Sequence, residues 1–183
     1  MGRAAFPLIR YSHIFSSAVR EVLEVALLRE AGVDGLTPRQ LHLLEFIGLA
    51  AHHIDEVAKF LGVTPPAATK AVDTLERHGL VVRKAHDTDR RVTMLGCSDA
   101  GRQLVERYRK LEEEKLDRVL QGFSDEDTDR LTDLLERYAL ALINSAPNSN
   151  AICLRCSGHY DSGCPLQFNE PGCAFTAETN DGH

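Results

Sequence analysis

The segment that most constrains the fold is residues 36–101, where three helix-like patterns precede two short β-prone runs. Two Thr-Pro pairs, at positions 37–38 and 64–65, each place an N-capping residue before a proline in the first helical position. Gly62 ends a short helix that begins near residue 54, and Gly79 ends the helix that follows. The segment therefore predicts a helix, a short helix, a tight turn and another helix.

The runs 80–83 and 92–95 are rich in valine and leucine and are separated by a polar, charged stretch. This pattern predicts an antiparallel hairpin directly after the helix-turn-helix. Longer amphipathic patterns flank the unit, over residues 7–29 and from Ser98 and Ser124 onward. The expected fold is mainly α, a winged helix-turn-helix with about six helices and a two-stranded β wing.

The helix over 65–78 has one apolar face and one open face. Ala68, Val72 and Leu75 recur at helical spacing and predict the buried side. The opposite face begins with small residues, so it can enter a DNA major groove without steric obstruction, and its N-terminal amides can approach phosphates. The candidate contacts on this face are Pro66, Ala67, Thr69, Lys70 and Arg77.

The net charge of −6 would by itself argue against a nucleic-acid partner. The charge is unevenly distributed, however. Residues 1–110 hold 16 basic and 13 acidic side chains, a net of +3, whereas residues 111–183 hold 5 basic and 14 acidic, a net of −9. The basic residues thus concentrate around the predicted helix-turn-helix and wing, where contact with DNA would need them.

Three short motifs within residues 36–101 resemble the MarR family of bacterial transcription regulators. They are LTPRQ at 36–40, LERHGLVVR at 75–83, and the wing sequence DTDRR at 87–91, which is followed by a glycine-containing helix start at 99–101. The resemblance implies a DNA-binding regulator, expected to be a repressor, that binds a pseudo-palindromic operator in double-stranded DNA as a homodimer. It covers about residues 1–145, with the DNA-binding core at 36–101.

The resemblance also implies roles for individual residues. Arg90 and Arg91 match the wing-tip arginines that enter the minor groove, with Asp87 and Asp89 bracing them, so Asp89, Arg90 and Arg91 join the candidate DNA contacts. The family's dimer helices match the two ends of the chain, where an extensive apolar face is formed by Phe15, Val19, Leu23, Leu131, Leu135, Tyr138 and Leu142. Family members often bind small aromatic inducers, and His42, Tyr11 or His13 would line such a pocket.

Residues 146–183 lie beyond the usual family pattern and contain four cysteines, Cys153, Cys156, Cys164 and Cys173. Their spacing, C-x2-C-x7-C-x8-C, predicts a metal-binding tail, because the segment has no apolar pattern that would fold it otherwise. An iron–sulfur cluster, a structural zinc and a set of redox-active thiols all remain open. The tail is either a metal or redox sensor that controls DNA binding or a purely structural zinc site. Cys97 is expected to be a small packing residue.

Other function classes find less support. No nucleophile, base and acid triad or phosphate-binding loop stands out, so an enzyme is not expected. A winged protein that binds only other proteins is disfavoured by the basic wing. The chain shows no signal peptide and no apolar run of membrane length, which predicts a cytoplasmic protein without a membrane partner. The adjacent His52 and His53 are expected to be solvated or to cap a helix.

Overall fold

The long amphipathic pattern near the start of the chain forms one continuous helical rod. The rod consists of α1 (Ala5–Ala18), the π-helical segment η1 (Val19–Val25) and α2 (Ala26–Glu30). In this computed structural model, which describes residues 5–33, 35–85 and 93–145, the helix predicted over 7–29 is confirmed. Its π-helical middle was not predicted, because a π-turn leaves the apolar spacing of a short segment almost unchanged.

The helices of the central unit begin where their caps predict. In α3 (Pro38–Leu49), the Thr37 side chain accepts from the Gln40 amide at 3.3 Å while the Gln40 side chain accepts from the Thr37 amide at 2.8 Å. Next come α4 (Ile54–Leu61) and α5 (Pro65–Arg77), joined by a turn in which Gly62 has φ of 62°. That left-handed conformation suits glycine, which has no Cβ to collide with the backbone.

The sheet has one strand more than predicted. Strands β2 (Val81–Ala85) and β3 (Thr93–Cys97) form the expected antiparallel hairpin. Within the described part of the chain a third strand, β1 (His52–His53), pairs with β3 on its other side and gives the order β1-β3-β2. The predicted two-stranded wing is therefore confirmed, whereas strand β1, which extends the sheet behind it, was not predicted. A two-residue strand has no periodicity that a sequence can show, and only its contact with β3 defines it.

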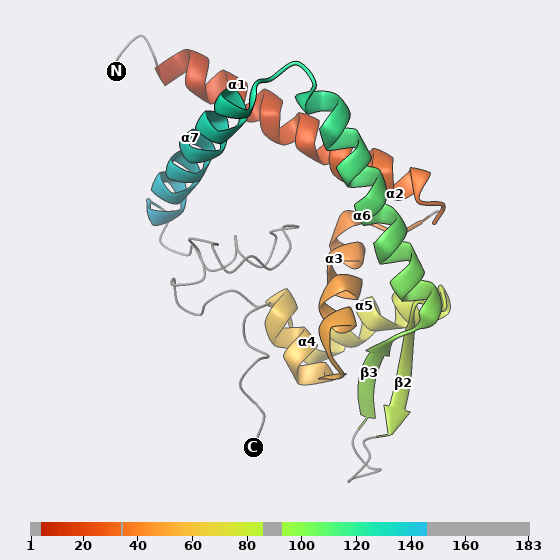
Figure 1. Cartoon of the computed structure of the whole chain (residues 1–183). Coiled ribbons are helices and arrows are strands. Elements are labelled where there is room, and N and C mark those ends of the chain that lie inside the picture. The colour runs from red at the N-terminus through yellow and green to blue at the C-terminus, as the bar shows by residue number, and fades with distance from the viewer. Residues whose placement is uncertain (1–4, 34, 86–92, 146–183) are drawn as a thin grey trace, which may run out of the picture.

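Two long helices complete the described chain, α6 (Asp99–Leu120) and α7 (Asp125–Asn144). Ser98 and Ser124 cap them, as predicted, by accepting from the amides of Gly101 and Asp127. Figure 1 shows the arrangement: the α1 rod, the far half of α6 and α7 lie at one end of the molecule, and the β2–β3 hairpin points away at the other. The mainly helical winged fold is therefore confirmed.

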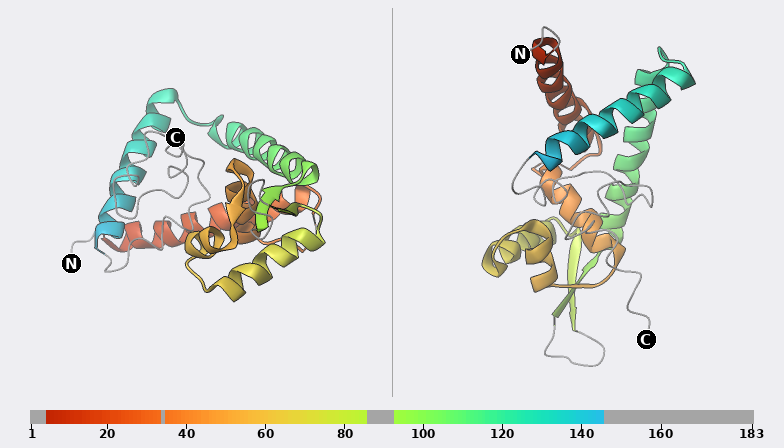
Figure 2. Two further views of the ribbon diagram at one scale, coloured as in Figure 1. Left: turned by 90° about the horizontal axis from the view of Figure 1, so that it is seen from below. Right: turned by 90° about the vertical axis from the view of Figure 1, so that its left-hand side faces the viewer.

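The core lies between these two ends. It is formed by the inner faces of α3, α4 and α5 together with Val81 and Leu95 of the sheet and Leu104 of α6. The two further views in Figure 2 show α7 lying across the rod near its N-terminal end while α6 runs past the other end. No helix in the described ranges is long and apolar enough to cross a membrane.

Candidate nucleic-acid interface

The inner and outer faces of α5 divide as predicted. Ala68, Val72 and Leu75 are completely buried, whereas Pro66, Ala67, Lys70 and Arg77 are exposed and Thr69 is half-buried. The five candidate contacts on this helix thus share one accessible face.

The N-terminal end of α5 differs from the expectation in two respects. Thr64 has the extended backbone of a capping residue, but its side chain makes no capping hydrogen bond. The amides of Ala67 and Ala68 both donate to the Thr64 carbonyl, at 2.9 and 3.0 Å. Pro65 and Pro66 have no amide hydrogen. Side chains rather than backbone amides must therefore make the polar contacts at this end of the helix.

Several side chains on α5 are held by the helix itself. The Thr69 hydroxyl donates to the Pro65 carbonyl at 3.0 Å. Arg77 donates through Nε to the Asp73 carbonyl at 3.3 Å and through Nη2 to the Thr74 hydroxyl at 3.0 Å. These bonds reduce the number of conformations that the side chains lose on binding, which favours contact with a rigid partner.

The hairpin is joined to α5 by an ion-pair cluster that sequence reasoning missed. The Arg83 guanidinium on β2 contacts the Asp73 carboxylate, and its Nε lies 3.2 Å from Glu76 Oε2. Strand alternation contained the signal, because Arg83 follows the buried Val81 by two residues and so points to the same side of the strand. The cluster couples the direction of the wing to the outer face of α5.

The base of the hairpin is also fixed. The Ser98 hydroxyl donates to the Gly79 carbonyl at 2.6 Å, and the Ser98 amide donates to the Leu80 carbonyl at 2.9 Å. Asp89, Arg90 and Arg91, the candidate wing contacts, lie outside the described residues, as does Asp87. What the structure defines is the pair of strands that leads to them, with Ala85 opposite Thr93 at the last register position.

The adjacent histidines have different roles, and the expectation for one of them was wrong. His53 caps α4, as predicted, since its Nδ1 accepts from the Asp55 amide at 3.4 Å. His52 is buried with 1% of its surface exposed, and its ring stacks on Phe46 with centroids 4.0 Å apart. Because a carbonyl can only accept, His52 Nε2 is the donor to the Phe46 carbonyl at 3.0 Å. Strand β1 turns this ring inward, which a helix-end position did not predict.

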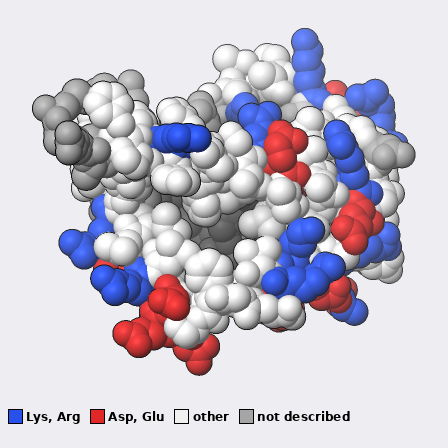
Figure 3. Space-filling model, turned by 90° about the horizontal axis from the view of Figure 1, so that it is seen from above, with Lys and Arg blue, Asp and Glu red and all other residues white. Residues whose placement is uncertain are grey.

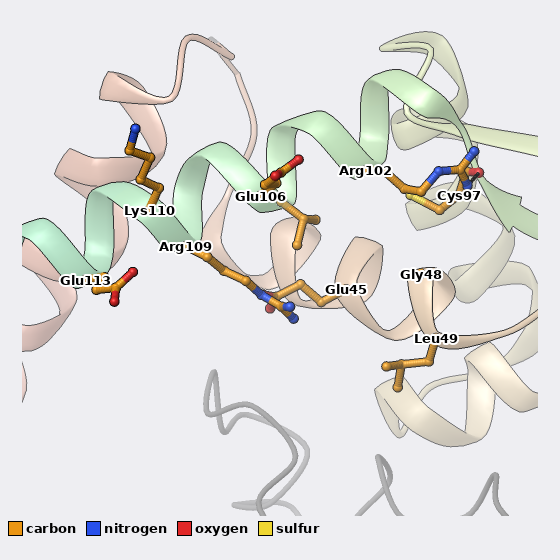
Figure 4. Close-up of a pocket in the computed structure, with 10 residues that line it drawn as sticks. Glu45, Gly48, Leu49, Cys97, Arg102, Glu106, Arg109, Lys110 and Glu113 are labelled. Atoms are coloured by element: carbon orange, nitrogen blue, oxygen red, sulfur yellow. Dashed lines mark hydrogen bonds and ion pairs between the residues drawn. The ribbon is translucent and has the colours of Figure 1, made fainter.

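A pocket of about 490 Å³ lies between α3 and α6, on the side shown in Figure 4. Apolar Leu49 and Val105 contribute to its wall, and Arg109 Nε lies 3.5 Å from Glu45 Oε1. The predicted pocket residues His42, Tyr11 and His13 do not line it. His42 packs in the core against Phe60, whereas the other two are exposed on α1.

Cys97 also borders this pocket, while most of its surface is buried against the core. Burial raises the pKa of its thiol; the positive charge of Arg102 partly opposes this shift, and the negative charge of Asp99 adds to it. A raised pKa keeps the thiol protonated near neutral pH and therefore poorly nucleophilic. Its predicted role as a packing residue agrees with this position.

The end of the molecule opposite the wing carries exposed apolar side chains. Phe6 and Tyr11 are 68% and 66% exposed, and Phe15, Leu134 and Leu142 about half. Figure 3, which views this end, shows that most of the middle of the face is neither acidic nor basic. Large apolar side chains that are exposed together in this way are typical of a surface that contacts another protein.

The four predicted metal ligands, Cys153, Cys156, Cys164 and Cys173, lie outside the described residues. Within residues 5–33, 35–85 and 93–145 no group of histidines, cysteines and carboxylates is arranged to hold a metal ion. The metal-binding prediction therefore concerns the tail alone.

Comparison with known proteins identifies the family. The family model described as MarR family matches residues 34–92. YdgJ, an uncharacterized HTH-type transcriptional regulator of Bacillus subtilis, is 29% identical over 108 residues. These residues make up 56% of this chain and 63% of YdgJ, so the chain spans just under two thirds of the length of this relative. The HTH-type transcriptional regulator MhqR of the same organism is 30% identical over 110 residues, 58% of this chain and 74% of MhqR.

The chain belongs to the MarR family. The family consists of transcription regulators, not enzymes. The solved structure of FabT of Streptococcus pneumoniae in complex with DNA superposes with a TM-score of 0.61 over 76% of this chain and 99% of FabT, at 22% identity. At that identity the superposition demonstrates the winged helix fold. The MarR resemblance expected from the sequence of residues 36–101 is thus confirmed.

Proposed function

We propose that this MarR-family protein binds an operator in double-stranded DNA and represses transcription, with α5 in the major groove and the wing in the minor groove. The observation that carries the proposal is the single accessible face formed by the outer side of α5 and the hairpin, which Arg83 joins through Asp73 and Glu76. FabT, a protein of the same fold, was solved in complex with DNA. The proposed contacts are the eight residues predicted from the sequence, Pro66, Ala67, Thr69, Lys70, Arg77, Asp89, Arg90 and Arg91.

The test is a titration of DNA from the protein's own upstream region at several salt concentrations. Each lost phosphate contact should reduce the slope of log affinity against log salt by about one unit. Lys70→Ala and Arg90→Ala should each produce that reduction and weaken binding. Arg118→Ala removes the same charge from an exposed site on the far half of α6, so its slope should equal that of the wild type. Equal slopes in all four proteins would contradict the proposed interface.

The proposal includes a homodimer formed through α1, α6 and α7, which would present two α5 helices to a pseudo-palindromic operator. Its support is the exposed apolar surface opposite the wing, including Phe15 and Leu134. Sedimentation should give twice the chain mass for the wild type and for Leu49→Glu, whose side chain is 47% exposed near the end of α3. Phe15→Glu, at a similarly exposed position on α1, should sediment as a monomer. A monomeric wild-type protein would overturn this part of the proposal.

A small aromatic inducer is proposed to bind the pocket between α3 and α6, whose volume falls within the usual range for small-molecule sites. Leu49 and Val105 offer contact to a ring, and Arg102 and Arg109 offer charge to an acidic substituent. A panel of phenols and benzoates, tested for increased thermal stability and weakened DNA binding, examines this point. A panel member that does both in the wild type but not in Val105→Glu supports it.

The cysteine tail is proposed to bind zinc or an iron–sulfur cluster through Cys153, Cys156, Cys164 and Cys173. The support is their spacing in the sequence. A bound metal would either stabilise the tail or make DNA binding responsive to oxidation, and the two roles predict different effects of tail removal on DNA affinity.

A further inference from the structure

The π-helical segment η1 is the most unusual backbone feature in the described chain. It interrupts an otherwise α-helical rod between Ala18 and Ala26, and the Ala26 amide donates to the Glu21 carbonyl, five residues back. A π-turn holds more residues than an α-turn, and such segments are rare and frequently occur at functional sites. If η1 became α-helical, every residue of α1 would rotate about the rod axis relative to the core.

The hydroxyl of Tyr108 on α6 holds this segment. It donates to the Leu23 carbonyl, inside η1, at 2.8 Å. Tyr108 is 5% exposed and belongs to the core, while Leu23 packs against the same core from the rod. The bond therefore connects the π-helical backbone to the winged unit across 85 residues of sequence.

A second bond, from the preceding residue of α6, fixes the other end of α2. Arg107 Nη1 donates to the Ala31 carbonyl at 2.9 Å, and Ala31 is completely buried. The two bonds lie on either side of the five-residue α2. Further along the rod, the Ser12 hydroxyl contacts Tyr138 of α7 rather than the winged unit. The direction of α1 relative to the core is thus determined where Tyr108 meets η1.

The environment of Tyr108 keeps its hydroxyl a donor. Burial, reinforced by the carboxylates of Glu112, Glu24 and Glu45, raises the pKa of the phenol well above its ordinary value. These carboxylates come from α6, η1 and α3, the elements that meet at the ring. The phenol therefore stays protonated throughout the physiological range.

We propose that Tyr108 is a positioning residue: by holding η1 in its π-helical form it sets the rotation of α1, and with it the separation of the two DNA-reading units of the dimer. The proposal rests on the dimeric DNA-binding function proposed above. Rotating α1 would turn Phe15 and its neighbours relative to the wing, so the dimer would match a different spacing of half-sites.

Hydrogen exchange on the full-length protein tests the first step without DNA. Tyr108→Phe keeps the ring and removes the donor, so the amides of residues 19–26 should exchange at least tenfold faster. Tyr138→Phe removes a hydroxyl that contacts the rod outside η1, at Ser12, and should leave exchange over residues 19–26 unchanged. Unchanged exchange in a folded Tyr108→Phe protein would overturn the proposal.

Operator spacing tests the second step. The probes are duplexes selected by the wild-type protein from a random pool, together with versions that have one base pair inserted or deleted between the half-sites. Tyr108→Phe should bind the selected duplex about tenfold more weakly, bind a single half-site within twofold of the wild type, and lose less affinity than the wild type when the spacing changes. An unaltered spacing preference would overturn the proposal. Wild-type protein that selects no duplex would instead refute the DNA-binding function, while hydrogen exchange would still decide the role of Tyr108.

A deletion provides a rescue test should Tyr108→Phe fold poorly. Arg20 is an exposed residue of η1. A π-turn contains one residue more than an α-turn, so deleting Arg20 allows the segment to become α-helical while α1 keeps close to its original rotation. Combined with Tyr108→Phe, this deletion should restore solubility and the wild-type spacing preference. A double variant no better than Tyr108→Phe alone would contradict the proposed role.

Discussion

Gly101 shows how one residue decides the contact between α6 and the sheet. An added Cβ there would lie 2.3 Å from the Leu80 carbonyl and 2.7 Å from Cys97 Sγ. The first of these atoms belongs to the backbone and cannot move aside like the end of a long side chain. The close approach of the first turn of α6 therefore depends on the missing side chain, as the glycine in the motif at 99–101 suggests.

Gly101→Ala should lower the free energy of unfolding by at least about 2 kcal/mol, because the added methyl overpacks a site bounded by backbone. Gly48→Ala is the matched control, since Gly48 lies within α3 and an added Cβ there meets nothing within 4 Å. That change should raise the free energy by about 0.5 to 1 kcal/mol through helix propensity. Urea denaturation of both variants measures the difference, and equal effects would contradict the packing described for Gly101.

Tyr108 should make stability depend on pH in alkaline solution. Its pKa is raised in the folded protein above the ordinary value of 10.0, so the unfolded chain releases this proton first. The stabilisation is complete below about pH 10 and is lost as pH rises from there toward the folded-state pKa. Above pH 10 the free energy of unfolding should fall more steeply in the wild type than in Tyr108→Phe, by up to about 1.4 kcal/mol per pH unit. Parallel curves for the two proteins would show that Tyr108 ionises equally in both states.

At the scale of elements, α5 and the β2–β3 hairpin behave as one unit. They are consecutive in the chain, are fixed at their junction by Ser98 and Gly79, and are joined further out by Arg83 with Asp73 and Glu76. The three charged side chains are each at least a third exposed, so the ion pairs contribute little to stability. Their consequence is the orientation of the wing relative to α5.

Arg83→Met should therefore separate stability from DNA binding. We expect the free energy of unfolding to change by less than about 1 kcal/mol, because exposed ion pairs are weak. DNA affinity should fall about tenfold, since the wing is no longer held against α5 and binding must order it. The paired control is Arg102→Met, which removes an exposed ion pair with Asp99 and a hydrogen bond to the Cys97 carbonyl at the base of the hairpin, both away from α5, and should have a smaller effect on affinity. Similar affinities for both variants would show that Arg83 does not orient the wing.

At the scale of the whole molecule, the two functions implied by the sequence lie at opposite ends. The outer face of α5 and the hairpin are at one end, and the exposed apolar surface of α1 and α7 is at the other. Helix α6 spans the distance between them and contacts the rod through Arg107 and Tyr108. In the proposed dimer, a change in how the two copies associate would therefore alter the spacing of the two α5 helices.

Anaerobically purified protein should contain metal bound by the tail. An iron–sulfur cluster would give a brown protein with broad visible absorption, and a structural zinc would give a colourless protein with one zinc per chain. Joint replacement of Cys153 and Cys156 by serine should abolish metal binding, whereas Cys97→Ser should retain it, because Cys97 is buried in the winged unit. Metal analysis of the three proteins distinguishes these outcomes, and a metal-free wild type would refute the tail site.

Local patterns in the sequence predicted the helices and most of their ends. Thr37, Ser98 and Ser124 cap the helices as expected, and Gly62 and Gly79 both adopt positive φ at the predicted breaks. Capping and turn conformation depend on residues only a few positions apart, so the sequence contains the whole interaction. The outer face of α5 was predicted for the same reason, because helical periodicity separates its two sides.

Only the tertiary structure decided the features that join distant segments. Strand β1 exists because His52 and His53 meet β3, and the wing is oriented by Arg83 reaching back to α5. The π-helical form of η1 is connected to a tyrosine 85 residues away. Each of these contacts joins two segments that are distant in the sequence. Its interaction energy depends on both segments together, so neither segment alone shows a hydrophobic periodicity that would predict it. The sequence by itself determined the long helices, the wing strands and the family, and the packing between elements determined strand β1, the π-helical turn and how the elements are held relative to one another.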